Sequence, residues 1–117
     1  MPIRTGNIQF NSMNILFICS RNKQRSATAE AVFRNHPEHS VQSAGTADSA
    51  VHRVNEKLLL WADITFVMEK RHREILQERF QLAIENKNIV VLNIPDEYEY
   101  MDEELIQMLQ DMVTPYL

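Results

Sequence analysis

The sequence predicts an α/β fold, a single domain in which a four-stranded parallel sheet carries helices on both faces. Short apolar runs alternate along the chain with segments of helical periodicity, and strands that alternate with helices form parallel sheets. The first run, residues 15–19, is apolar at every position, as expected of a strand buried on both faces. A chain of 117 residues is the size of one domain.

The elements follow one another in a regular order. The predicted strands lie at residues 15–19, 41–44, 64–68 and 89–92. The predicted helices lie at residues 26–35, 51–61, 69–80 and from 103 onward. Because ligands of parallel sheets bind beyond the carboxyl ends of the strands, residues that follow different strands can meet there.

Propensity and spacing predict the first two helices. Three alanines and a glutamate within residues 27–31 have high helix propensity. In the next helix the apolar residues fall at helical spacing between Val51 and Trp61. Asp48 or Ser49 can accept the hydrogen bond that caps its first turn.

The last two helices are amphipathic. In residues 69–80 the apolar side chains of Ile75, Leu76 and Phe80 share one face, and most of the other residues are charged. Asp102 is the predicted N-cap of the final helix, whose apolar residues recur three or four positions apart.

Composition excludes several classes of function. With 44% hydrophobic and 24% charged residues, the chain resembles an ordinary soluble protein, and its net charge of -4 argues against nucleic-acid binding. No apolar run approaches the ~18 residues of a membrane span. Residues 1–12 lack the apolar core of a signal peptide. We expect them to be either a loose tail or residues added before a natural start at Met13, ahead of a domain of residues 13–117. The single cysteine fits a reducing cytoplasm, and no Cys/His grouping has the spacing of a zinc site.

The most informative segment joins the first strand to the first helix. Cys19, the only cysteine, ends the strand, and Arg25 and Ser26 begin the helix. Backbone N–H groups and the helix dipole favour an anion at such a place, and a guanidinium can bind two phosphate oxygens at once. The same positive field favours the thiolate form of Cys19. These parts, in this order, predict a phosphate-binding loop with a cysteine nucleophile.

These residues resemble a known family. Residues 19–26 resemble the phosphate loop of the low-molecular-weight protein tyrosine phosphatases, and residues 29–34 resemble the helix that follows it. Residues 43–46, 62–69 and 95–98 are similar to the end of its second strand, its third strand and its acid loop. The resemblance implies a cytoplasmic enzyme without metal or cofactor. Such an enzyme hydrolyses a phosphate monoester, such as phosphotyrosine, through a phosphocysteine.

The resemblance also implies three catalytic roles. Cys19 attacks phosphorus, and Arg25 binds the phosphoryl oxygens and stabilises the charge of the transition state. Asp96 protonates the leaving oxygen and then activates water, with Glu97 or Glu99 as alternative acids. The expected ligands are a phosphorylated protein or a small phosphate monoester, and inorganic phosphate or sulfate can occupy the loop.

Other residues are expected to bind the substrate or to shape the loop. Ser26 donates to the departing thiolate. Asn22 is best able to supply a positive φ in a loop without glycine, and in the family this asparagine links to the serine at Ser43. The predicted substrate-binding set is Ser20, Arg21, Asn22, Lys23, Gln24, Ser26, Ser43 and Tyr98.

Several of these residues have a plainer interpretation. Cys19 could be a buried structural cysteine, Ser26 an ordinary N-cap, and Tyr98 a half-buried residue at the rim. Arg21 and Lys23 could steer anionic substrates or be solvated charges. The four histidines are interpreted as lying at helix ends or on polar helix faces, and we assign them no role.

The chain departs from the family at four places. Arg21 stands where a glycine is frequent, Gln24 where many members have a second cysteine, and Glu97 where the acid loop has a proline. Residues 47–63 are a shorter version of a segment that helps to wall the substrate cleft. The short cleft and Glu97 favour an alternative function, a module that binds phosphoproteins without turnover. A second alternative is arsenate reduction, although its thioredoxin-linked form needs further cysteines.

Overall fold

The computed structural model describes residues 12–117, and the expectation for residues 1–12 lies outside the described part apart from Ser12. The strands are β1 (Asn14–Cys19), β2 (Ser40–Gly45), β3 (Ile64–Val67) and β4 (Asn88–Val91). They form one parallel sheet in the order β2-β1-β3-β4. The helices are α1 (Arg25–Phe33), α2 (Glu56–Trp61), α3 (Lys70–Arg79), α4 (Gln81–Ile84) and α5 (Glu103–Val113), followed by the 3-10 turn η2 (Thr114–Tyr116). The predicted fold class, the single domain and the parallel sheet are confirmed.

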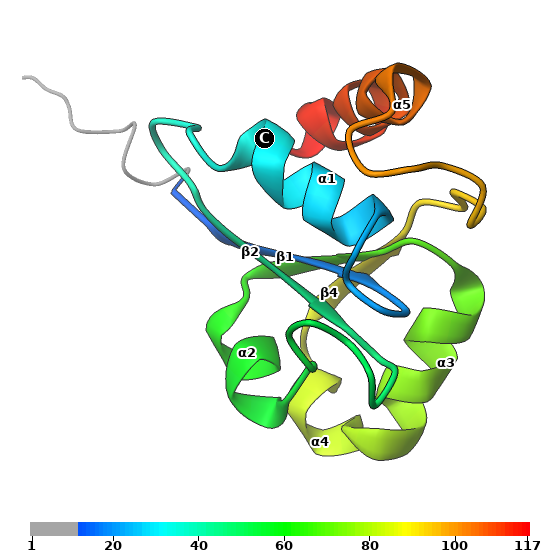
Figure 1. The fold of residues 1–117 in the computed structure, drawn as a ribbon. Coiled ribbons are helices and arrows are strands. Elements are labelled where there is room, and N and C mark those ends of the chain that lie inside the picture. The colour runs from blue at the N-terminus through cyan, green and yellow to red at the C-terminus, as the bar shows by residue number, and fades with distance from the viewer. Residues whose placement is uncertain (1–11) are drawn as a thin grey trace, which may run out of the picture.

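Helices cover both faces of the sheet. Figure 1 shows α1 and α5 on one face and α2, α3 and α4 on the other. On the α1 side, the ring of Phe17 stacks between Phe33 and Phe66, with centroids 5.7 Å and 5.4 Å away. On the other side, Leu16 and Ile18 belong to the cluster formed by the remaining helices. β1 is therefore central and buried on both faces, as its uninterrupted apolar sequence predicts.

The second helix is shorter than the sequence predicts. It begins at Glu56, and its N-cap is Asn55, whose side chain accepts a hydrogen bond from Leu58 N at 2.8 Å. The prediction that Asp48 or Ser49 caps this helix is wrong.

The residues before this helix form a loop because they bind the end of β2. Gly45 N donates to His52 O at 2.8 Å, and Val54 N donates to Gly45 O at 2.9 Å. This pairing makes a parallel bridge between Gly45 and Arg53 and keeps the backbone extended. Val51, predicted to be helical, is 58% exposed in this loop.

The third predicted helix is divided in two. Phe80 leaves the helical conformation, with φ -133° and ψ 38°, and separates α3 from α4. The turn allows Ala83 and Ile84 to be buried in the cluster on this face of the sheet. Asp102 caps α5 as predicted, accepting hydrogen bonds from Glu104 N and Leu105 N. None of the helices in residues 12–117 is long and apolar enough to cross a membrane.

Candidate active site

The loop between β1 and α1 encloses the sulfur of Cys19. Asn22 N donates to Cys19 Sγ at 3.3 Å, and Ser26 Oγ lies 2.9 Å from the same sulfur. Asn22 has a φ of 60°, and its side-chain amide donates to Ser26 Oγ at 2.8 Å and to Ser43 Oγ at 2.9 Å. The predicted left-handed turn and the predicted link to Ser43 are therefore both present. They tie the loop to β2.

Because Gly45 has no side chain, the loop that follows β2 can pack closely against the backbone of the phosphate loop. Gly45 pairs with Cys19 in the sheet register. A Cβ atom on Gly45 would lie 2.4 Å from the carbonyl oxygen of Ser20 and 2.7 Å from Ala50 Cβ. The close approach lets Thr46 N donate to Cys19 O at 3.0 Å and Ala47 N donate to Ser20 O at 2.9 Å. The main chain around the cysteine is therefore held in place by the segment after β2.

Arg25 is not a surface arginine. Its side chain is 2% exposed and has three polar partners, from the start of α3 and from the segment after β4. Nη1 donates to Ile94 O at 2.7 Å and lies 3.0 Å from Glu69 Oε1. Nε lies 3.8 Å from Asp96 Oδ1. A buried guanidinium needs such partners because an unpaired buried charge is very unfavourable. The resulting placement holds the charge beside Cys19.

Glu69 and His72, at the start of α3, support this arrangement. Burial by itself raises the pKa of Glu69, but hydrogen bonds from Arg25 and Arg71 outweigh it and hold the pKa below its usual value. His72 Nδ1 accepts from Glu69 N at 3.0 Å, so the neutral ring carries its proton on Nε2 and donates to Ser20 Oγ at 3.0 Å. α3 is thereby attached both to the arginine and to the phosphate loop.

Sequence reasoning placed Glu69 directly after the third strand but gave neither Glu69 nor His72 a role at the site. The histidines were not expected to be buried, yet His72 is 0% exposed and His39 is 6% exposed. His39 Nδ1 accepts from Met13 N at 3.0 Å, far from Cys19 in the sheet. The signal that could have identified His72 is its position three residues after Glu69, where a capping box places a side chain that reaches back to the N-cap.

Asp96 meets Cys19 at the carboxyl edge of the sheet, as the strand order predicts. A small cavity at this edge is lined by Cys19, Ser20, Arg21, Lys23, Gln24, Arg25 and Asp96. The Asp96 carboxylate is half exposed. The cavity thus brings together a sulfur, a buried guanidinium and an accessible carboxylate.

Tyr98 does not line this cavity. It is half-buried and packs against the core on the α1 and α5 side of the sheet, and its hydroxyl lies 4.0 Å from Met108 Sδ. Of the predicted substrate-binding residues, Asn22, Ser26 and Ser43 form the hydrogen-bonded support described above. Ser20, Arg21, Lys23 and Gln24 line the cavity.

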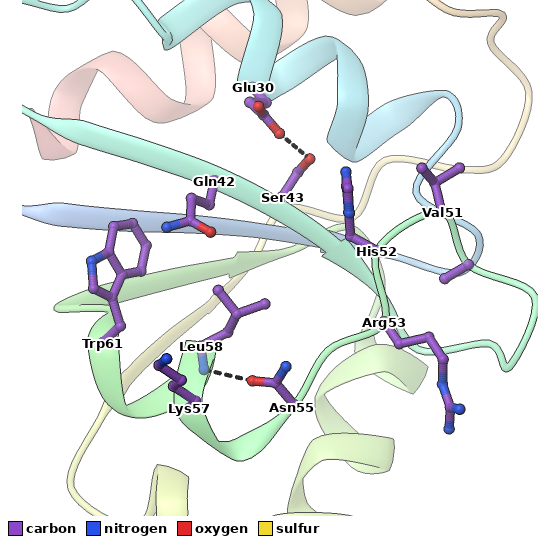
Figure 2. Close-up of a pocket in the computed structure, with 11 residues that line it drawn as sticks. Glu30, Gln42, Ser43, Val51, His52, Arg53, Asn55, Lys57, Leu58 and Trp61 are labelled. Carbon is purple, nitrogen blue, oxygen red and sulfur yellow. Dashed lines mark hydrogen bonds between the residues drawn. The ribbon is translucent and has the colours of Figure 1, made fainter.

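A larger cavity lies beside the phosphate loop. Figure 2 shows it between α1, β2, the loop before α2 and α2 itself. Its volume is about 750 Å³, and Trp61 and Leu58 form apolar parts of its wall. Ser43 donates to Glu30 at its edge. Cys19 and the buried Arg25 do not line this cavity; they line the smaller one.

Protonation of His72 should destabilise the fold at mildly acidic pH. Burial, followed by the charges of Arg25 and Arg71, lowers the pKa of His72 from 6.5 to about 4. The folded protein then binds fewer protons than the unfolded chain between these values. The stabilisation is complete above pH 6.5 and is lost as the pH falls toward 4. Between pH 7 and pH 5 we expect the free energy of unfolding to fall by about 2 kcal/mol more in the native protein than in His72→Gln.

Urea denaturation at the two pH values measures this difference. His52→Gln is the matched control because His52 is exposed, and it should lose as much stability as the native protein. Equal losses in His72→Gln and the native protein would show that the buried ring does not titrate in this way.

The sequence was compared with models of protein families, and one family matches most of the chain. The sequence model of the low molecular weight phosphotyrosine protein phosphatases matches residues 14–114. No curated protein gave a match in a sequence search.

Several solved structures share the fold. The tyrosine phosphatase Wzb from Escherichia coli K30, in complex with phosphate, is 24% identical with a TM-score of 0.71 over 88% of this chain and 94% of its own. Wzb from Vibrio vulnificus, in complex with benzylphosphonate, is 22% identical with a TM-score of 0.66 over 88% and 93%. The arginine phosphatase YwlE from Geobacillus stearothermophilus is 22% identical with a TM-score of 0.66 over 89% and 87%.

Proposed function

Since this chain belongs to the low molecular weight phosphotyrosine protein phosphatase family, a family of cysteine-dependent enzymes, we propose that Cys19 is its nucleophile and phosphotyrosine in proteins its substrate. The observation that carries the proposal is the position of Cys19 Sγ. It accepts a hydrogen bond from Asn22 N at 3.3 Å, lies 2.9 Å from Ser26 Oγ and shares a cavity with buried Arg25.

In the first step, the Cys19 thiolate attacks phosphorus while the bond from phosphorus to the substrate oxygen breaks. The electron pair of that bond stays on the leaving oxygen, which takes a proton from Asp96. Arg25 binds two of the phosphoryl oxygens, and the positive end of α1 favours their charge. Because Glu69 and Ile94 O already hold the guanidinium, little reorientation is needed during the reaction.

In the second step, water attacks the phosphorus of phosphocysteine. Asp96, now a carboxylate, takes a proton from the water, and the bond from sulfur to phosphorus breaks. Ser26 Oγ, 2.9 Å from Sγ, donates to the departing thiolate and makes it a better leaving group. The products are inorganic phosphate and the free enzyme.

The Asp96→Asn protein should turn over slowly while keeping its affinity for phosphate. An amide cannot donate or accept the proton, and loss of acid–base catalysis costs roughly 10²–10⁴-fold in rate. Steady-state hydrolysis of an alkyl or peptide phosphate measures the loss, because a poor leaving group needs the acid. Glu97→Gln is the matched control, since Glu97 is exposed and does not line the cavity. If Glu97→Gln lost more activity than Asp96→Asn, the acid would be misassigned.

The direct test of the function is hydrolysis of a generic aryl phosphate, with vanadate as competitor. An enzyme releases phosphate continuously, whereas a binding module retains the ligand and releases no product. Loss of arsenate in the presence of an external thiol would instead favour arsenate reduction. The structures of Wzb from Escherichia coli K30 with phosphate and with sulfate bound support an anion site in this fold.

The choice between phosphorylated tyrosine and phosphorylated arginine is tested with matched peptides. One similar protein is an arginine phosphatase. In this chain Arg21 and Lys23 lie at the cavity, where their charge disfavours a substrate that brings a guanidine group of its own. We therefore propose the aryl ester as the better substrate. We also propose that the enzyme acts in the reducing cytoplasm, where Cys19 stays a free thiol.

A further inference from the structure

The structure leaves two cations at the cavity without a role in the chemistry. Arg21 and Lys23 are exposed and line the same cavity as Cys19. Among the described residues neither side chain forms an ion pair, although Arg25 has carboxylates within 4 Å. The single phosphoryl group is already served by Arg25 and by the positive end of the α1 dipole. Two cations therefore remain for another part of the substrate.

The main chain beneath both side chains is fixed. The carbonyl oxygen of Arg21 accepts a hydrogen bond from Val51 N at 3.1 Å. Figure 2 shows Val51 beside the loop that leads into α1. Lys23 follows Asn22, whose side chain is bonded to Ser26 and Ser43. Since the backbone is held, binding a ligand restricts only the two side chains, which limits the entropy cost.

The cavity is therefore flanked by opposite charges. Arg21 and Lys23 lie on the phosphate-loop side. On the other side lies the exposed carboxylate of Asp96, from the segment after β4, whereas Glu97 and Glu99 are exposed but do not line the cavity. The protein as a whole has a net charge of -4, whereas the loop side of the cavity carries two cations. An anionic group next to the phosphate is attracted only to the loop side.

We propose that Arg21 and Lys23 select phosphotyrosine sites with an acidic side chain next to the phosphorylated residue. The proposal rests on the proposed phosphatase function and adds the substrate class that this site prefers. Complementary charge at the rim of an interface sets partner choice and association rate more than it sets maximal affinity. The selection should therefore appear in kcat/KM, and it should weaken as salt is added.

The test compares two phosphotyrosine peptides that differ only in having glutamate or glutamine beside the phosphotyrosine. For the native protein at low salt we expect kcat/KM to be about 3- to 10-fold higher for the glutamate peptide, from two exposed charge pairs. In the double variant Arg21→Gln, Lys23→Gln this ratio should fall to about 1. The double variant Arg34→Gln, Lys57→Gln is the control, because it changes the net charge equally at exposed sites outside the cavity.

The results distinguish a wrong phosphatase function from a wrong substrate preference. If neither peptide is hydrolysed, and a generic aryl phosphate is not either, the proposed function is wrong. If both peptides are hydrolysed at equal rates by the native protein, the selection by Arg21 and Lys23 is wrong. A preference that persists in the Arg21→Gln, Lys23→Gln protein, folded by circular dichroism, overturns the proposal as well.

Discussion

The Cys19→Ser protein is expected to hydrolyse aryl phosphates at the background rate, a loss on the order of 10⁴-fold or more. A serine hydroxyl is nearly the size of the thiol but stays protonated, and among the described residues no carboxylate or imidazole hydrogen-bonds to this position. The partners of the sulfur, Asn22 N and Ser26 Oγ, can still hydrogen-bond the hydroxyl. We therefore expect an intact fold and an intact phosphate site without turnover.

Two measurements separate this result from a folding defect. Phosphate release reports turnover, and calorimetric titration with inorganic phosphate or vanadate reports the anion site. The matched control is Ser49→Ala, which removes an exposed hydroxyl outside the cavity and leaves the sulfur in place. A Cys19→Ser protein with a substantial fraction of native activity would show that the cysteine is not the nucleophile.

The Arg25→Lys protein is expected to lose about 10³-fold in kcat, nearly as much as Arg25→Ala. The guanidinium donates to Ile94 O and lies 3.0 Å from Glu69, and Arg25 also lines the cavity. An ammonium is a point charge without the planar fork, so it cannot satisfy these partners and also bind two phosphoryl oxygens. Charge alone should therefore not rescue the rate.

Arg71→Lys is the matched control for this experiment. Arg71 is the exposed partner of the same Glu69 carboxylate, at 2.8 Å, and it does not line the cavity. We expect its kcat to stay within a fewfold of the native value. If Arg25→Lys kept more than about a tenth of native activity, phosphate binding would depend on charge and not on the bidentate geometry.

The parts of the site that sequence predicted are those set by local order along the chain. The order of parts along the chain fixes where Cys19 and Arg25 lie relative to each other. A strand ends at the cysteine, five residues follow, and the arginine begins the helix. The absence of glycine pointed to Asn22 as the residue with positive φ. Because the strands are parallel, Asp96, which follows β4, lies at the same carboxyl edge of the sheet as Cys19.

The parts that sequence did not predict depend on distant contacts. The buried His72 forms a hydrogen bond with Ser20, which is 52 residues away, and the histidine itself carries no periodic signal. The loop before α2 was misinterpreted because helical spacing from Val51 onward was outweighed by the pairing of Gly45 with Arg53. Tyr98 turned toward α5 because the core on that side offered it an apolar environment.

The central claim is that the reaction forms a covalent phosphocysteine at Cys19, and this intermediate should be detectable in the Asp96→Asn protein. With an aryl phosphate whose leaving group departs without protonation, the first step needs no acid, whereas the second still lacks its base. The phosphoenzyme should therefore accumulate. Rapid quenching followed by mass spectrometry of the peptides should find one phosphoryl group on the peptide that contains Cys19. Phosphate release without a phosphorylated Cys19, or with the phosphoryl group on another residue, would contradict the account.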